Sequence, residues 1–337
     1  PEHQPVFAGI HQLIDRKDWD KYPGSKEAID KEAKGLLANE TWSFEEVVPR
    51  SELLSRKEHL NLGRLMTILS IKHFETPELR KLKARIVFRG DQIVDEANNL
   101  AILQELKVNP SGLTGINFNL AYGALPNHDT TQSDVVRAYT QSYLNTKCQT
   151  WVELPPELVP AEHRNVVRPC VRLHKALYGH PEAGWHWDQR FKTVMTQMGG
   201  EHSESFQSSY WFKGSKLLLT LYVDDMVLSG PASAHGAFWR ELEKHLEIEP
   251  PTPVDRVLGR KHIRETKDGT TTVEYDMQDF CANACDLFER LCAQRCGDAL
   301  RAGGQSPCYR LGCQRSPRGK REQDLDENIV VSQAFSA

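Results

Sequence analysis

The chain has 337 residues, a formal net charge of −4 and a hydrophobic content of 39%, enough for a sizeable core and two or three subdomains. Its mean hydropathy is −0.54. No apolar run approaches the length that spans a bilayer, which argues against a helical membrane protein. The low net charge counts mildly against nucleic-acid binding, although local charge matters more than the total. No signal-peptide pattern opens the chain, and a proline as first residue suggests a piece of a longer polyprotein.

The first part of the chain mixes helix and strand signals. Residues 1–24 are interpreted as a lead-in. Residues 26–37 are predicted to form a helix, because alanine and leucine side chains recur on one side at helical spacing. Residues 79–88 alternate between apolar and polar side chains, which predicts a strand.

The predicted strand carries a basic strip. Side chains alternate across a strand, so Lys81, Lys83 and Arg85 share one face while the intervening apolar residues face the core. Arginine can hold phosphate oxygens with two hydrogen bonds, and lysine acts as a point charge. The strip therefore suits a phosphate-bearing ligand, with an ordinary solvated strand face as the alternative.

An acidic tetrapeptide, residues 222–225 (YVDD), lies between two apolar runs at residues 217–221 and 226–228. These runs predict a hairpin with two adjacent carboxylates at its tip. Each ionised carboxylate is costly to hold beside its twin and beside apolar walls. A bound divalent metal removes that cost, so the pattern indicates a metal site for phosphoryl chemistry.

A third carboxylate has to come from a second strand that ends beside the hairpin. Asp134 is the best candidate, because residues 133–139 (SDVVRAY) are predicted to be a strand end that turns into a helix. Two metal ions about 3.5–4 Å apart can activate a hydroxyl and stabilise the leaving oxygens of an in-line displacement. Mg²⁺ prefers such carboxylate ligands and keeps open positions for substrate phosphates.

Several segments together resemble the reverse transcriptase of Ty1/copia-type retrotransposons. One YxDD sequence is weak evidence, because short acidic motifs occur by chance. A set of motifs in family order, spanning about residues 25–280, is strong evidence. The matching segments are residues 28–32 with 39–42 (AIDKE, NETW), 83–87 (KARIV), 133–139 (SDVVRAY), 151–156 (WVELPP), 175–179 (KALYG), 222–225 (YVDD) and 258–259 (LG).

The resemblance implies an α+β fold: a fingers–palm polymerase core whose antiparallel palm sheet is backed by helices. Residues 25–130 would then be a fingers-like segment, residues 131–230 the palm with the acidic hairpin, and residues 231–296 the end of the core near the thumb. In the palm, a helix is predicted around residues 185–198.

The segment at the end of the core has its own local signals. Residues 234–246 are predicted to be a helix, since Phe238, Leu242 and Leu246 are spaced by four. Residues 261–275 are predicted to be a hairpin that turns at Asp268-Gly269.

The implied activity is RNA-directed DNA polymerisation, in which a primer 3′-hydroxyl attacks the α-phosphate of a dNTP on an RNA or DNA template. The resemblance makes Asp134 and Asp224 the chief ligands of two Mg²⁺ ions, for which Mn²⁺ can substitute, with Asp225 in support. It implies that Lys83 and Arg85 hold the triphosphate.

Further contacts follow from the same resemblance. Tyr139 would form the floor of the sugar pocket and disfavour a 2′-hydroxyl, with a buried helix aromatic as the plain alternative. Tyr222 and Trp185 would contact the nucleic acid. Aromatic rings such as Trp185 and Trp187 can stack on bases, and at least one of these two is expected in the core.

One segment departs from the family pattern "LYGLKQSPRAWY". Glu182 stands where the family has a glutamine that contacts the nucleotide, and Gly184 and Trp185 stand at the "PR" positions. An acid near a triphosphate repels it unless it is paired or turned away. The departure is explained either by a variant with its own solution or by a catalytically inactive remnant that at most binds nucleic acid.

Other classes remain open. A different two-metal phosphoryl-transfer enzyme, such as a nuclease, would degrade template without dNTP. A pure binding module would show salt-dependent affinity and no turnover. RNase H and integrase segments are not recognisable, so those activities would come from elsewhere. The resemblance implies action in virus-like particles in the cytoplasm, or in the nucleus, and no targeting signal is seen.

The cysteines do not indicate a metal site. Cys148 and Cys170 are isolated and are interpreted as small buried hydrophobes. Four further cysteines are spaced as CxxxC pairs on one helix face without a turn between the pairs, which makes a zinc site geometrically unfavourable. They are interpreted as an apolar helix face in a reducing compartment. The four are Cys281, Cys285, Cys292 and Cys296.

The end of the chain changes in character. Residues 297–337 are basic and loop-like in their first half and have no periodicity after that. They are predicted to be mostly disordered. A nucleic-acid-binding tail and the degenerate end of a decayed element are the two interpretations.

Overall fold

The computed structural model describes residues 12–56, 58–72, 78, 80–95, 97–99, 111–267, 270–278 and part of the stretch 280–292. The chain forms two compact units, Pro1–Gly123 with Asn127–Thr252, and Ala124–Pro126 with Pro253–Ala337. The segment boundaries predicted above remain predictions. Among its described residues, the first unit has the α-helices α1 (Ser25–Ala38), α2 (Arg50–Ser55), α3 (Leu113–Gly123), α4 (Ala183–Gln197) and α5 (Ala232–Leu242).

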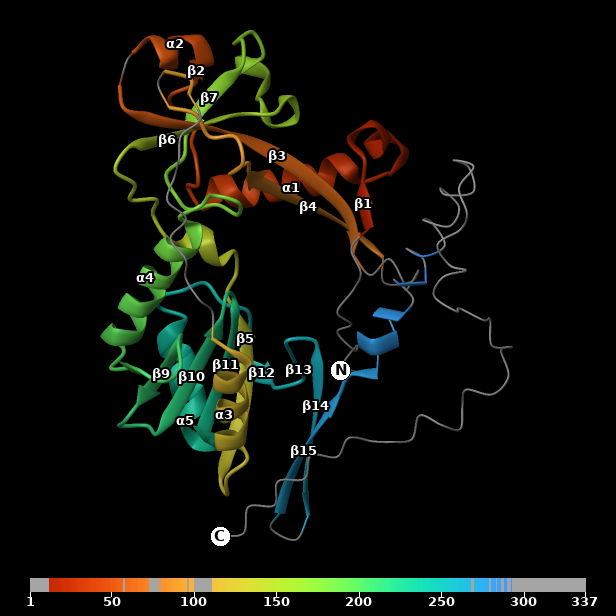
Figure 1. Ribbon diagram of the computed structural model, residues 1–337, viewed down its shortest axis with the longest axis vertical. Coiled ribbons are helices and arrows are strands. Elements are labelled where there is room, and N and C mark those ends of the chain that lie inside the picture. The colour runs from red at the N-terminus through yellow and green to blue at the C-terminus, as the bar shows by residue number, and fades with distance from the viewer. Residues whose placement is uncertain are drawn as a thin grey trace, which may run out of the picture. The chain divides into compact units, whose positions relative to one another are not determined.

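The first unit contains two sheets (Figure 1). In the first sheet the strand order is β1-β3-β6-β7-β2, and β4 also pairs with β3. The long strand β3 changes partner along its length, because its beginning pairs parallel with β6 and its remainder pairs antiparallel with β4. These strands are β1 (Gln12–Ile14), β2 (Val48–Pro49), β3 (Leu60–Lys72), β4 (Lys81–Phe88), β6 (Gln149–Glu153) and β7 (Pro169–Arg172).

Helix α1 packs on β4 and β3. It buries Ile29 and Leu36 in a core that also contains Trp42, Leu69 and Ile86. The predicted helix over residues 26–37 is therefore confirmed, and its buried stripe follows from the helical spacing of its apolar residues.

Strand β4 confirms the predicted alternation from residue 81 onward, while residue 79 lies outside the described residues. Ala84 and Ile86 are buried, Lys81 and Arg85 are exposed, and Lys83 is half-buried. The basic strip thus occupies one face of the strand.

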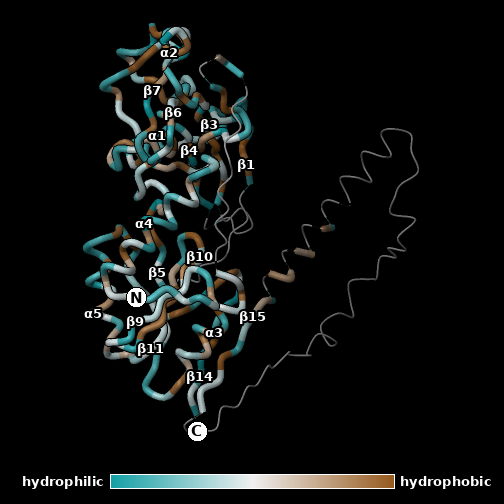
Figure 2. The backbone as a smooth tube through the Cα atoms, turned by 60° about the vertical axis from the view of Figure 1, so that its left-hand side comes forward, coloured by the Kyte–Doolittle hydropathy of each residue, from teal (hydrophilic) through white to brown (hydrophobic). Residues whose placement is uncertain are grey.

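The second sheet of this unit is antiparallel where its registers are given, and it includes the order β5-β11-β10-β9-β8. Its two central strands, β10 and β11, are strongly apolar apart from the turn that joins them (Figure 2). The strands are β5 (His128–Asp134), β8 (Glu201–His202), β9 (Ser209–Phe212), β10 (Leu217–Tyr222), β11 (Asp225–Pro231) and the short β12 (Thr252–Pro253).

Helices cover both faces of the second sheet. On one face, α4 and α5 share a core with alternate residues of β10 and β11, which include Leu219, Leu221 and Leu228. On the other face, α3 packs against β10 and β11. Successive side chains of a strand point to opposite faces of the sheet, so strands covered by helices on both faces bury side chains on both. The helix predicted around residues 185–198 is confirmed as α4. The helix predicted over residues 234–246 is confirmed as α5, which ends at Leu242.

A buried amide ties α3 to the sheet. The Asn119 side chain is fully buried, and its Nδ2 donates to Leu218 O at 3.0 Å, Thr220 Oγ1 at 2.9 Å and Val227 O at 3.1 Å. These acceptors belong to both strands of the β10–β11 hairpin. The two N–H groups of the amide share these three acceptors, so the helix is tied to both strands of the hairpin.

The second unit contains the antiparallel strands β13 (Arg256–Val257), β14 (Arg260–Lys267) and β15 (Thr270–Asp276). The hairpin predicted over residues 261–275 is confirmed by the β14–β15 pairing. Its predicted turn, Asp268-Gly269, lies outside the described residues, as does the tail at residues 297–337.

The cysteines only partly match their interpretation. Cys170 is fully buried, and burial raises the pKa of its thiol to about 12, whereas Cys148 is half-buried. Cys281 and Cys285 are exposed, so the interpretation of an apolar helix face is wrong for these two. Helical spacing alone could not separate a buried face from a solvated one. Cys292 is half-buried, and Cys296 lies outside the described residues.

The architecture is mixed, with helices on sheets that are mainly antiparallel, as in the predicted α+β class. Within the part of the chain that the structure covers, no helix is both long and apolar enough to cross a membrane.

Candidate active site

The acidic tetrapeptide forms the tip of the β10–β11 hairpin. Tyr222 pairs with Asp225, which leaves Val223 and Asp224 in a two-residue turn. Val223 has φ of 60°, a left-handed conformation that is unfavourable for a β-branched residue. From α4, Trp187 Nε1 donates to Val223 O at 2.7 Å. Trp187 is buried at 3% exposure, so the expectation that one of the two tryptophans is in the core is confirmed.

Asp134 is the last residue of β5, and it lies directly opposite Asp225 in the β5–β11 register. The backbone N–H of Val135 donates to Asp224 O at 2.8 Å. The end of β5 and the tip of the hairpin are therefore adjacent, and the three predicted carboxylates are brought together from two segments about ninety residues apart in sequence.

The carboxylates perturb one another. Burial raises the pKa of Asp225 to about 7, and the charges of Asp134 and Asp224 together with a hydrogen bond to Asp134 add to this. Burial and the charge of Asp224 also raise the pKa of Asp134, whereas its hydrogen bond with Asp225 lowers it. Asp225 is thus the carboxylate whose ionised form is disfavoured by burial and by its two acidic neighbours.

This donor set fits a hard divalent cation, because it consists of oxygen ligands whose mutual repulsion a cation would relieve. Among the described residues, no three acidic, histidine or cysteine side chains are already arranged around a single ion position. The predicted ligands are therefore neighbours in the fold that do not yet surround one ion position.

Lys83 on β4 interacts electrostatically with one of the carboxylates, Asp224. Burial lowers the pKa of Lys83, as do Arg85 and Lys72, while Glu32 and Asp224 raise it. Lys83 and Asp224 are consequently within electrostatic reach of each other although they lie on different sheets. The charge of Asp224 is thus felt by Lys83, one residue of the basic strip.

Two tyrosines interact with the acidic site, and one of them also contacts the basic strip. The rings of Tyr139 and Tyr178 meet edge-on with centroids 4.6 Å apart, and the Arg85 guanidinium carbon lies 5.8 Å from the centre of the Tyr178 ring. Burial and the negative charge of Asp224 raise the pKa of both phenols, that of Tyr178 to about 12. Tyr178 was not predicted as a site residue, although it lies in the KALYG segment. Lys72, whose charge lowers the pKa of Asp134, was not predicted either.

Glu182 and Trp185 have other neighbours. A carboxylate oxygen of Glu182 lies 3.4 Å from Nε2 of the buried His186. The Glu182 backbone N–H donates to His180 Nδ1 at 3.2 Å. Trp185 is 37% exposed and rests edge-on against His186 with centroids 4.9 Å apart. The structure thus gives Glu182 a basic neighbour, while it brings neither residue into direct contact with the three carboxylates within the described region.

The wider sequence comparisons agree with this geometry. A sequence model of the family described as "Reverse transcriptase (RNA-dependent DNA polymerase)" matches residues 69–289. The chain belongs to the reverse transcriptase family. It is 28% identical over 214 residues to the Transposon Ty1-DR4 and TyH3 Gag-Pol polyproteins of Saccharomyces cerevisiae, which is 64% of this chain. The chain spans only 12% and 11% of the lengths of those two polyproteins.

A cavity of about 630 Å³ opens where the end of β4 meets the KALYG segment of this reverse transcriptase chain. Two glycines form its walls. A methyl group on Gly179 would overlap the carbonyl oxygen of Phe88, and one on Gly90 would overlap the carbonyl oxygen of Gly179. The lining residues are Met66, Phe88, Arg89, Gly90, Asp91, Gly179 and Pro181.

Acid is expected to destabilise this region through His180. Its ring is 4% exposed and packs on Phe88 with centroids 4.9 Å apart. Burial, with a smaller effect of His186, lowers its pKa from 6.5 to about 4. The stabilisation from keeping the ring neutral is complete above pH 6.5 and is lost as pH falls towards 4, by up to about 3 kcal/mol.

The measurement is the free energy of unfolding in urea between pH 7 and pH 4. His180→Leu carries the apolar residue that the family pattern has here, and it should flatten the pH dependence over this window. An unchanged pH dependence in that variant would show that His180 does not cause it.

Proposed function

We propose that this chain is the polymerase core of a copia-like retrotransposon and acts as an RNA-directed DNA polymerase. The first sheet with α1 would be the fingers, and the second sheet with its helices would be the palm. The observation that carries the proposal is the adjacency of Asp134 to Asp224 and Asp225, with Lys83 of the basic strip close enough for Asp224 to raise its pKa. A polymerase needs such a junction between acidic metal ligands and a phosphate-binding strip.

In this proposal, Asp134 and Asp224 are the chief ligands of two divalent cations, and Asp225 supports Asp134. Reverse transcriptase domains generally use such metals; Mg²⁺ or Mn²⁺, when bound, supplies positive charge that favours ionisation of the primer 3′-hydroxyl and offsets charge on the leaving pyrophosphate. Lys83 and Arg85 hold the triphosphate.

The remaining contacts concern the sugar and the nucleic acid. Tyr139, held edge-on by Tyr178, forms the floor of the sugar pocket. Tyr222 and Trp185 contact the primer or template. The Glu182 carboxylate lies against the ring of the buried His186, and this position is the variant solution that its departure from the family pattern requires.

Primer extension on a poly(rA)–oligo(dT) template with Mg²⁺ or Mn²⁺ tests the proposal. Extension that depends on dTTP and metal supports it. A folded protein that binds the duplex but extends no primer would favour the inactive remnant, the alternative that Glu182 raises. Degradation of the template without dNTP would favour a nuclease. The similar Gag-Pol polyproteins suggest that other Pol segments act beside this core, in virus-like particles.

Tyr139→Ala is expected to admit ribonucleotides. Removal of the ring opens the space that a 2′-hydroxyl would enter, so the preference for dTTP over UTP should fall at least about tenfold. The measurement is the ratio of kcat/KM values for the two nucleotides. Tyr139→Phe keeps the ring and should keep the preference. Equal ratios in Tyr139→Ala and the parent protein would exclude this role.

A further inference from the structure

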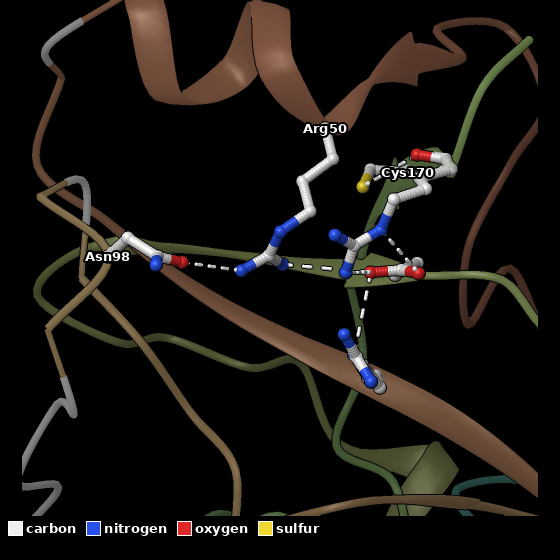
Figure 3. A network of polar contacts seen from close by, with 6 residues as sticks. Arg50, Asn98 and Cys170 are labelled. Carbon is white, nitrogen blue, oxygen red and sulfur yellow. Dashed lines mark hydrogen bonds and ion pairs between the residues drawn. The ribbon is translucent and has the colours of Figure 1, made fainter.

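One carboxylate in the first sheet is surrounded by three arginines (Figure 3). Glu153, at the end of β6, receives two hydrogen bonds from Arg168, at 3.0 and 2.7 Å. Arg50 Nη1 lies 3.7 Å and Arg64 Nε lies 3.5 Å from the same carboxylate oxygen. The cluster joins α2, β3, β6 and the segment before β7, and it carries two more positive than negative charges.

The arginine cluster has hydrogen-bond donors that the Glu153 carboxylate does not use. Arg168 alone satisfies the carboxylate with a two-point contact. Arg50 also donates to Asn98 Oδ1 at 2.8 Å. Within the described residues, neither terminal nitrogen of Arg64 has a hydrogen-bond partner, and the Arg64 side chain is 46% exposed. Arg64 therefore presents free donors at the surface.

Three guanidinium groups around one carboxylate repel one another. Burial lowers the pKa of Arg50, and the charge of Arg168 lowers it further. The Arg50 side chain is 11% exposed and Arg168 is 45% exposed, so the surplus charge is only partly relieved by water. An additional anion that contacts Arg64 and Arg168 would offset this repulsion. A purely structural brace for Glu153 would not need the third arginine.

The arginine cluster lies next to residues that line the cavity at the KALYG segment. Arg64 and Met66 are two residues apart on β3, both are exposed, and so they lie on one face of that strand. Met66 lines the cavity. The backbone N–H of Arg89, another lining residue, donates to Arg64 O at 2.9 Å. A chain of phosphates that passes the cavity would therefore meet Arg64 next.

We propose that Arg64, with Arg168 and Arg50 behind it, binds a backbone phosphate of an unpaired nucleic-acid strand, namely the template ahead of the primer terminus. The inference rests on the proposed polymerase function for the identity of the strand. The ligand is recognised by its phosphate, so the site reads charge and position and not base sequence.

The test is the affinity of Arg64→Gln for two labelled duplexes, one blunt and one with about ten unpaired template nucleotides, measured by fluorescence anisotropy across a salt series. Glu153 keeps Arg168 and Arg50 in this variant, so the fold should persist. Affinity for the overhang duplex should fall about three- to tenfold, and the salt slope should decrease by about 0.7, the value for one single-strand phosphate. Affinity for the blunt duplex should not change.

Arg240→Gln is the matched control, because it removes the same charge from an exposed position on α5. It should leave both affinities and the slope as in the parent protein. RNA and DNA overhangs, tested separately, should both lose affinity in Arg64→Gln. Unchanged overhang affinity in Arg64→Gln, or an equal loss for the blunt duplex, would overturn the inference. The binding assay does not depend on catalysis. If the protein extends no primer, the polymerase proposal is refuted, and the binding assay still tests the inference about Arg64.

Discussion

Asp224→Asn is expected to reduce primer extension by on the order of a thousandfold or more. The substitution keeps the size of the side chain in the turn after Val223 but removes one negative charge. A neutral amide is a poor ligand for a hard divalent cation, and the repulsion that makes this corner of the sheet attract such a cation is weakened. The measurement is the single-turnover rate at saturating dNTP and metal.

The control for this prediction is Asp225→Asn. Burial and the charges of Asp134 and Asp224 raise the pKa of Asp225, so its negative charge is disfavoured in the parent protein, and the asparagine amide can still donate to Asp134. Its loss of rate should therefore be smaller than that of Asp224→Asn. Circular dichroism and duplex affinity should match the parent protein in both variants. Undiminished extension by a folded Asp224→Asn protein would refute the assigned roles.

Gly179→Ala is expected to reduce the free energy of unfolding by about 3 kcal/mol or more. Gly179 has φ of +88°, which a residue with a side chain rarely adopts, and its new methyl group would overlap the Phe88 carbonyl. The adjoining backbone bond, Phe88 N–H to Tyr178 O at 2.8 Å, connects β4 with the KALYG segment. Extension should fall too, because Tyr178 would move with that segment.

Gly214→Ala is the matched control, since it lies in a turn where an added methyl group meets nothing within 4 Å. Its effect should stay within about 0.5 kcal/mol. Both variants are compared by urea denaturation at pH 7, where a shift of the midpoint at constant slope reports stability. Equal midpoints for the two variants would mean that the contact at Gly179 is not tight.

The acidic hairpin and the basic strip could be predicted because their signals are local. Two apolar runs around adjacent carboxylates indicate a hairpin tip, and alternation along residues 81–88 separates Lys83 and Arg85 from the core. The pairing of Asp134 with Asp225 is not local. It depends on strands that are far apart in sequence, and the motif order of a family suggested it where spacing could not.

Other features gave no signal in the sequence. Tyr178 lies in an apolar segment, where a core tyrosine and a site tyrosine look the same. The three arginines around Glu153 come from three separate segments, so their convergence depends on the parallel pairing of β3 with β6. The contact between Glu182 and His186 could not be predicted either, because nothing in the sequence distinguishes His186 from other helix residues. In each case tertiary contacts decide the chemistry.

The amide of Asn119 has a consequence for how the hairpin is assembled. Because Asp224 and Asp225 are adjacent and identical, a strand that slipped by one residue would still present a carboxylate to Asp134, and charge alone would not distinguish the two pairings. Such a slip would turn every side chain of the strand to the opposite face. The three acceptors of Asn119, on Leu218, Thr220 and Val227, coincide in one pairing only. The contacts of Asn119 therefore stabilise the observed alignment of the acidic strand over a slipped one.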